Sequence, residues 1–303
     1  MSADSNAVHE GFGAEMRAPA AMSATRPLYW SIRREIWEYR SIYIAPLAVA
    51  GVTLLGFLVA SMGAAMSTHN LTRRHAILEE PYTFAAGAIM ATTFIVSIFY
   101  CLDALYGERR DRSILFWKSL PVSDLTIVLS KASIPFVVLP LVTFAVTFAT
   151  QWVMLLVSSA VLVGSGLSAA ALWAQLSAFQ MSLLYHLVTV HSLWYAPIFA
   201  WMMLVSGWAR RAAFLWATLP VLAIAVVEKI TFNTAHFTNL LKYRFSGPED
   251  FDFSMATGVS AMGPMTHLSL GRFLSTPGLW SGFVVAVIFL WAAVRLRRYR
   301  EPI

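Results

Sequence analysis

Charged residues are scarce in this chain. Only 13% of its 303 residues are Asp, Glu, Lys or Arg, whereas soluble domains carry about a quarter. Hydrophobic residues make up 58% of the sequence, and the mean hydropathy is +0.65. This composition excludes an ordinary soluble domain, and it predicts an all-α polytopic membrane protein.

Cysteine and nucleotide-binding motifs are also nearly absent. The single Cys101 lies in an apolar run, so the chain cannot form an intrachain disulfide. No G-x-x-x-x-G-K-[ST] phosphate loop occurs, because Gly164-Ser-Gly166 is followed by apolar residues and lacks the Lys. We therefore expect that the chain alone hydrolyses no ATP and holds no cofactor or catalytic residue.

Three possible chemical sites can be weighed from the sequence. They are the intramembrane pair His186 and His191, the acidic group Glu249, Asp250 and Asp252, and Ser165. The histidines have no acid at the same membrane depth, which favours interfacial or helix-bonded roles. Three acids in a turn-rich loop are more often solvated than metal-bound, and no base is marked for the serine. We predict no metal site and no enzymatic activity.

Six apolar runs are each long enough to cross a bilayer, which takes about 20 residues per helix. They cover approximately 42–66, 83–105, 124–164, 181–208, 212–232 and 279–297. Pro135, Pro140, Pro197 and Pro220 fall within these runs, where we expect them to bend the helices.

The orientation follows from the distribution of Lys and Arg. Arg109, Arg110 and Arg112 lie between the second and third runs, and Arg210 and Arg211 lie between the fourth and fifth. Positive residues favour the cytoplasmic side, so we predict a multi-pass protein of the bacterial plasma (inner) membrane with both termini cytoplasmic. The formal charge of +6 then reflects this bias and anionic lipid rather than a nucleic-acid partner.

Three segments lie outside the spans. Residues 1–28 lack a continuous apolar core, which predicts a disordered cytoplasmic tail rather than a signal peptide. Residues 29–40 interleave aromatic residues with Arg and Glu, which favours either a helix in the inner interface or a simple aromatic anchor. Residues 233–278 form the outer segment between the last two spans. One amphipathic helix is expected over residues 229–243, which begin just before this segment.

The connection at 107–131 is the only stretch in which charge is dense. A charged entry is followed by a short apolar helix and then by Pro121. Ser123 is predicted to cap a new helix, and Asp124 suits the positive end of its dipole. The alternating charges at Asp103 and Glu108–Arg112 fit either a positive-inside anchor or a surface that meets a partner's charged face. The ordered helix favours the second interpretation.

This connection resembles the cytoplasmic loop of type-2 ATP-binding cassette (ABC) exporter permeases. That loop reads Glu-Arg, a short helix beginning Thr/Ser-Ile/Leu, then Leu-Pro-Val/Ile-Ser and a Lys one turn into the next span. The matching positions here are Glu108, Arg109, Ser113, Ile114, Leu115, Leu120, Pro121, Val122, Ser123 and Lys131.

The resemblance implies a permease subunit with six transmembrane helices, an N-terminal interfacial helix and a cytoplasmic coupling helix. A separate ATPase subunit would bind ATP and Mg²⁺, and a second permease copy, identical or similar, would complete the export path. The residues implied to contact the partner are Glu108, Arg109, Arg112, Ile114, Leu115, Trp117, Leu120, Pro121, Glu35 and Glu38. The alternative is a stand-alone membrane enzyme or an ion-coupled carrier, which buried charge at mid-membrane would favour.

Overall fold

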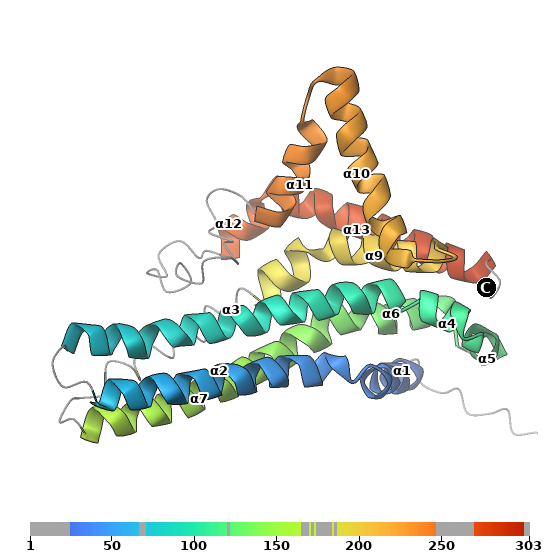
Figure 1. Ribbon diagram of the computed structural model, residues 1–303. Coiled ribbons are helices and arrows are strands. Elements are labelled where there is room, and N and C mark those ends of the chain that lie inside the picture. Colours follow the sequence, from blue (N-terminus) through green and yellow to red (C-terminus); the bar gives the residue numbers. More distant parts are fainter. Residues whose placement is uncertain are drawn as a thin grey trace, which may run out of the picture.

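The chain is helical in every regular element of the part that the computed structural model describes, which is residues 25–66, 71–119, 122–164, 170, 173, 184, 187–246 and 270–299 (Figure 1). Five of these helices are long and apolar enough to cross a membrane, or six if one bent pair counts as a single span. The expected all-helical, multi-pass character is therefore confirmed.

The elements follow one another along the chain without a strand in the described ranges. The first half contains α1 (Thr25–Glu38), α2 (Ser41–Met66), α3 (Leu71–Asp103), α4 (Tyr106–Arg110), α5 (Ser113–Ser119), α6 (Asp124–Ser133), the π-helix η1 (Ile134–Val138) and α7 (Leu139–Gly164). The second half contains the π-helix η2 (Leu187–Trp194), α9 (Ala196–Trp208), α10 (Ala213–Phe232), α11 (His236–Ser246), α12 (Leu270–Ser275) and α13 (Pro277–Tyr299). Each predicted span overlaps at least one of these helices.

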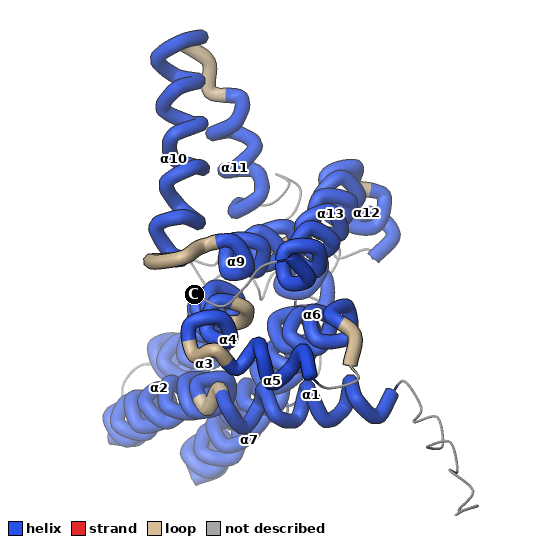
Figure 2. Tube along the Cα trace, turned by 90° about the vertical axis from the view of Figure 1, so that its right-hand side faces the viewer, coloured by secondary structure: helices blue, strands red, loops and turns tan. Residues whose placement is uncertain are grey.

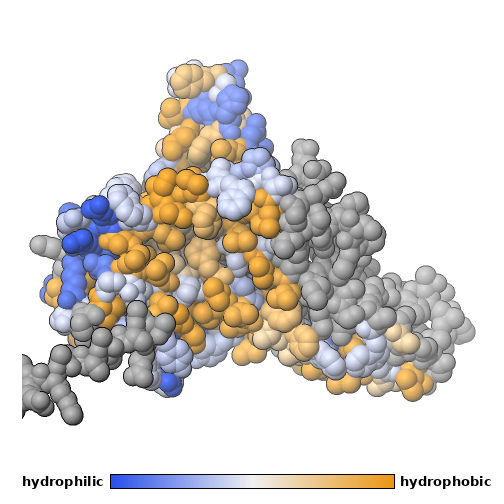
Figure 3. Space-filling view, turned by 180° about the vertical axis from the view of Figure 1, so that it is seen from behind, coloured by the Kyte–Doolittle hydropathy of each residue, from blue (hydrophilic) through white to orange (hydrophobic). Residues whose placement is uncertain are grey.

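The long helices other than α10 lie side by side, and α1 lies across them. Helix α2 packs against α3 and α7, while α13 packs along α9, which also contacts α3. Helix α1 is seen along its axis in Figure 1 and lengthwise in Figure 2, where α2, α3 and α7 are seen from their ends. Helices α1, α4 and α5, the start of α6 and the end of α13 meet at one end of the bundle, which we name the charged end. Figure 3 shows hydrophilic residues gathered there and hydrophobic residues over the middle of the same face.

The start of α1 corrects one boundary. Residues 25–28 are helical, so the predicted disordered tail is wrong for these positions. Pro27 is compatible with the first turn of a helix, where a missing backbone N–H costs nothing. Residues 1–24 lie outside the described part of the chain.

Prolines distort two of the spans, as expected. Pro135 lies inside η1, so that α6, η1 and α7 form one run with a local π-turn. Such turns arise where the regular hydrogen-bond ladder is interrupted. Pro197 lies in the first turn of α9, directly after η2, and the two elements meet at 40°. Pro220, in contrast, lies within a continuous α10.

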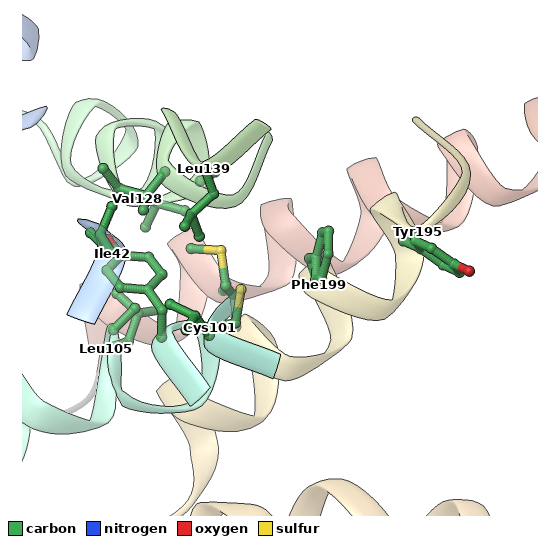
Figure 4. Close-up of a cluster of buried hydrophobic side chains, with 14 of the residues drawn as sticks. Ile42, Cys101, Leu105, Val128, Leu139, Tyr195 and Phe199 are labelled. Atoms are coloured by element: carbon green, nitrogen blue, oxygen red, sulfur yellow. The ribbon is translucent and has the colours of Figure 1, made fainter. Parts of the chain in front are cut away.

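An apolar cluster holds the helices together beside the charged end. Its fully buried members include Ile42 from α2, Cys101 from α3, Val128 from α6 and Leu139 from α7, and Phe199 joins them from α9 (Figure 4). Side chains from five elements therefore share one core, which fixes the positions of the helix ends that carry the charges.

Helices α10 and α11 form a hairpin that stands away from the other helices (Figures 1 and 2). The expected single helix over 229–243 is wrong, because Asn233 has a left-handed backbone (φ 48°) and ends α10. The carboxylate of Glu228 then accepts hydrogen bonds from Thr234 Oγ1 and from two backbone N–H groups of α11 at 2.6 and 2.9 Å. An acid at a helix N-terminus stabilises the new start.

The C-terminal end of α11 is anchored on α13 by Arg244. Its Nη1 donates to the Gly278 carbonyl at 2.9 Å, and its guanidinium lies 4.6 Å from the centroid of the Trp194 ring. A Cβ atom at Gly282 would lie only 1.4 Å from Arg244 Nη2. Burial lowers the pKa of Arg244 to about 10, so the guanidinium remains charged at neutral pH. Only glycine at position 282 leaves room for this contact.

We predict that Gly282→Ala displaces Arg244 and destabilises the fold by about 1–3 kcal/mol, the range for an overpacked site. The matched control is Gly87→Ala in α3, where an added Cβ meets nothing within 4 Å. That change should be neutral or stabilising, by up to about 1 kcal/mol, because alanine is the better helix former. Equilibrium unfolding in detergent compares the two variants, and equal stabilities would contradict the Arg244 contact.

Candidate functional site

The charged end contains ionised side chains that are buried. Lys131 of α6 lies between two carboxylates, with its Nζ 2.8 Å from Glu35 Oε1 of α1 and 3.3 Å from Glu108 Oε1 of α4. The three side chains are only 3–6% exposed. A charge removed from water is costly unless it is paired and hydrogen-bonded, and here each carboxylate contacts the same ammonium group.

The pairing extends to the last helix. Arg297 of α13 binds Glu108 Oε2 through Nη1, and its Nε lies 3.2 Å from Asp124 Oδ1 at the start of α6. We name Glu35, Glu108, Asp124, Lys131 and Arg297 the ion cluster. Its two cations and three carboxylates give a formal charge of −1. It joins α1, α4, α6 and α13, which are far apart in the sequence.

Two tyrosines extend the hydrogen bonding from the ion cluster to α3. The Tyr100 hydroxyl donates to Glu35 Oε2 at 2.8 Å, and the Tyr39 hydroxyl donates to Asp103 Oδ2 at 2.9 Å. Their rings meet edge to face at 4.9 Å. Burial, followed by the charge of Asp103, raises the pKa of Tyr39 well above its ordinary value. The phenol therefore remains protonated and can donate at any physiological pH.

Helix α9 holds the break between α3 and α4. The Ser206 hydroxyl accepts hydrogen bonds from the backbone N–H groups of Leu105 and Tyr106 at 2.9 and 2.8 Å. In return, Arg109 Nη1 of α4 donates to two carbonyl oxygens at the end of α9, at 2.9 and 3.0 Å. A cation at the C-terminus of a helix satisfies carbonyls that lack partners there. Helix α4 is thus fixed from both sides.

Helix α5 is attached to this frame by one side only. Ile114 is 1% exposed and points inward, whereas Leu115 and Phe116 are 56% and 62% exposed. The ring of Trp117 is covered by the guanidinium of Arg34 from α1, at 4.2 Å from its centroid. We name Leu115 and Phe116 the α5 surface. It is an apolar face presented to the outside on a braced helix.

The turns on either side of α5 are well defined locally. Arg112, between α4 and α5, has a left-handed backbone with φ 58°, a conformation that ends the preceding helix. On the other side, Ser123 Oγ accepts from the backbone N–H of Thr126 at 3.1 Å. The predicted cap at Ser123 is confirmed. Leu120 and Pro121, two of the residues implied to contact a partner, lie outside the described residues.

The structure places Glu108, Arg109 and Glu35, three of the residues implied to contact a partner, in the interior of the chain. All three are buried, at 3–7% exposure, and their polar groups bind other parts of the chain. The physical reason is pairing, because exposing the carboxylates would leave Lys131 and Arg297 as buried cations without a counter-charge.

The other predicted residues divide between the surface and the interior. Leu115, Arg112 and Glu38 are exposed, and Glu38 pairs with Arg34 at 2.7 Å. Trp117 is half-buried. Three functional residues are not apparent from the sequence: Phe116 of the α5 surface, and Asp124 and Arg297 of the ion cluster. Arg297 lies among other basic residues at the end of the last span, a pattern that by itself predicts only an anchor on the cytoplasmic side of the membrane.

Of the chemical sites weighed from the sequence, His191 is the one that lies among the described residues. His191 is fully buried, with Nε2 3.4 Å from Ser97 Oγ and the ring of Phe94 edge to face with its own. His186, Ser165 and the acidic group at 249–252 lie outside the described residues. Among the residues that are described, no group of three or more His, Cys, Asp or Glu has the geometry to hold a metal ion.

Comparison with known proteins adds no assignment. No protein-family model matches the chain, and neither a curated protein nor a solved structure matches it. The charged end itself is therefore the basis for assigning a function to this chain.

We predict that Lys131→Met destabilises the fold by about 3–5 kcal/mol, because it leaves the buried carboxylate of Glu35 without a cation and Glu108 with Arg297 alone. Adding Glu35→Gln should recover a large part of the loss, since the remaining buried carboxylate, Glu108, still binds Arg297. The control is the ion pair of Arg34 and Glu38 on α1, of which Glu38→Gln should cost about 0.3–0.5 kcal/mol and leaves the Arg34–Trp117 contact in place. Unfolding in detergent measures each variant. Equal losses for Lys131→Met and Glu38→Gln would disprove the buried pairing.

Proposed function

We propose that this chain is the permease subunit of an ABC transporter of the export type in a bacterial inner membrane. ATP and Mg²⁺ would be bound by a separate ATPase subunit, and the chain itself would carry out no catalysis. The observation that carries the proposal is the α5 surface, which lies within the loop that resembles the coupling loop of such permeases.

The α5 surface suits a protein partner. Two large apolar side chains exposed side by side on a short helix gain free energy when a groove covers them, at about 25 cal/mol per Å² of apolar area. Such anchors supply most of the binding energy of many interfaces. The helix is held in place before binding by Ile114 and by the Arg34–Trp117 contact, which lowers the entropy lost on association.

The ion cluster offers a route from the α5 surface to the spans. Helix α5 follows α4 directly, and α4 carries Glu108, which binds both Lys131 and Arg297. A push on α5 would therefore move α4, α6 and α13 together with α1. In the proposed mechanism, ATP draws the two ATPase subunits together, and this closure is passed through α5 to reorient the spans.

A second permease copy would complete the transporter. Helix α10 is the least buried of the long apolar helices, with 11% of its apolar window inside the structure. Its exposed side chains include Phe214, Leu219 and Ile230. Lipid or a second copy would cover this surface in the proposed assembly.

An ion-coupled carrier or a stand-alone membrane enzyme is the alternative. A protein of either kind would be expected to carry charged side chains near the middle of the membrane. The buried charges of the ion cluster lie instead near the ends of helices. Lys131 is the furthest inside, and it follows Asp124 by two helical turns. This position favours a structural and coupling role over ion transport.

The first test of the proposal concerns partner binding. Leu115→Ala and Phe116→Ala should each weaken binding of the ATPase subunit by about 2 kcal/mol, roughly thirtyfold, if the α5 surface is a central anchor. The measurement is binding to the ATPase subunit that the proposal requires, with both proteins purified and the permease in lipid nanodiscs. The stability of the permease should hardly change, because the two side chains are exposed.

The matched control is Leu156→Ala in α7, a side chain of similar exposure at 57%, which should leave the affinity unchanged. Wild-type affinity in both α5 variants would return α5 to an ordinary connection between two spans.

The second test concerns orientation. In a Cys101→Ala background, a cysteine at the exposed Lys242 of α11 should react with an impermeant thiol reagent added outside intact cells. A cysteine at the exposed Arg210 should react only after the membrane is opened. The reason is the predicted cytoplasmic location of the α9–α10 connection. Labelling of position 210 in intact cells would refute the topology and, with it, the coupling role of α5.

A further inference from the structure

A line of polar side chains runs along the buried face of α7, away from the ion cluster. It consists of Thr143, Thr147, Gln151 and Ser158, all of which are fully buried. The first and last members bind α3. Thr143 Oγ1 lies 2.6 Å from Thr93 Oγ1, and Ser158 Oγ lies 3.0 Å from the Tyr82 hydroxyl. These two contacts show that this face of α7 is turned toward α3.

The two middle members have polar atoms without partners. Thr147 Oγ1 and both amide atoms of Gln151, Oε1 and Nε2, form no hydrogen bond with the described part of the chain. An α-helix turns by about 100° per residue. Around the axis of α7, the side chains of Thr147, Ser158 and Gln151 therefore lie about 40°, 60° and 80° from that of Thr143. Both therefore face α3 between the two bonded pairs, in the stretch where Ala85 and Ala86 are buried.

The chemistry of these atoms defines what can bind them. Gln151 offers one acceptor and one donor group, and Thr147 can donate or accept. A ligand must therefore both donate and accept hydrogen bonds. A metal ion would meet the amide N–H as well as the oxygens, and an anion would find no positive charge on either residue. An apolar molecule would leave all three atoms unpaired, which is costly in an apolar interior.

We propose that Thr147 and Gln151 hold a water molecule between α3 and α7. The two residues are one helical turn apart, so their side chains are neighbours on the helix surface and one small molecule can contact both. Buried water typically occupies polar sites where it satisfies two to four groups of this kind. Over residues 85–89, the side chains of α3 that are buried are Ala85, Ala86 and Ile89, none of which carries a polar atom. The proposal is independent of the transport function, because it depends only on the packing of α3 and α7.

X-ray radiolysis footprinting of the purified chain in detergent tests the proposal. Hydroxyl radicals formed from a bound water oxidise the nearest reactive side chain, even where bulk solvent cannot reach. Met154 is one turn from Gln151 on the same face of α7, and Met203 of α9 is the matched control, since both are 0% exposed. We expect Met154 to be oxidised several-fold faster than Met203.

Substitutions at positions 147 and 151 test whether a water bound at this site causes the oxidation of Met154. Thr147→Val combined with Gln151→Leu removes all three polar atoms at similar volume, so Met154 oxidation should fall to the Met203 rate while the Met203 rate stays constant. Thr147→Val alone is the milder variant if the double variant fails to fold, and it should lower the Met154 rate in part. Equal rates for the two methionines in the wild type, or an unchanged Met154 rate in the variants, would overturn the proposal. A Met154 rate that changes when sodium is replaced by choline would also overturn it, in favour of a bound cation.

Discussion

The pairing of Lys131 with Glu35 and Glu108 is the interaction on which the charged end of this protein depends. None of the three charges could remain buried alone, because each would then lack a counter-charge in a region shielded from water. Together they are compatible with burial, and Glu108 passes the pairing on to Arg297. The crosswise position of α1 and the meeting of α4, α6 and α13 follow from this requirement.

The order of α5 is a consequence of the same pairing. A seven-residue helix is too short to be stable by itself in water, so its structure must come from its neighbours. Helix α4 is fixed by the ion cluster and by Ser206, and α5 continues from it with Ile114 packed inward. Leu115 and Phe116 lie on the other side of the helix and are exposed. The apolar surface of α5 is thus held on a rigid support, as the proposed coupling role requires.

Buried cations are accommodated in two ways in this structure, by carboxylates or by carbonyl groups. At the charged end, Lys131 and Arg297 are neutralised by carboxylates. Near the α10–α11 hairpin, Arg244 is bound by a carbonyl group and an aromatic ring instead, and the absence of a side chain at Gly282 makes the contact possible. The first arrangement resists separation of its helices strongly. The second lacks a counter-charge among the residues described, so we expect it to yield more easily when α11 moves against α13.

Much of this fold could be predicted from local sequence, but the site could not. The apolar runs, the cap at Ser123 and the short helix after Arg112 depend on residues close together in the chain. The inward position of Glu108 depends on Lys131 and on Arg297, which is 189 residues away, and charge patterning alone does not distinguish a paired interior acid from a surface one. The break at Asn233 is local, but the apolar pattern continues through it, and Glu228, the acid that caps the next helix, lies before the break.

The central claim is that this chain transmits the energy of ATP hydrolysed on another subunit. Its most direct test is the rate of ATP hydrolysis in lipid nanodiscs by the chain alone, by the ATP-binding subunit that the proposal requires, and by the two together. The account predicts no hydrolysis by the chain alone and a rate for the mixture that differs clearly from that of the ATP-binding subunit by itself. Hydrolysis by the purified chain, or a rate that the chain leaves unchanged, would contradict it.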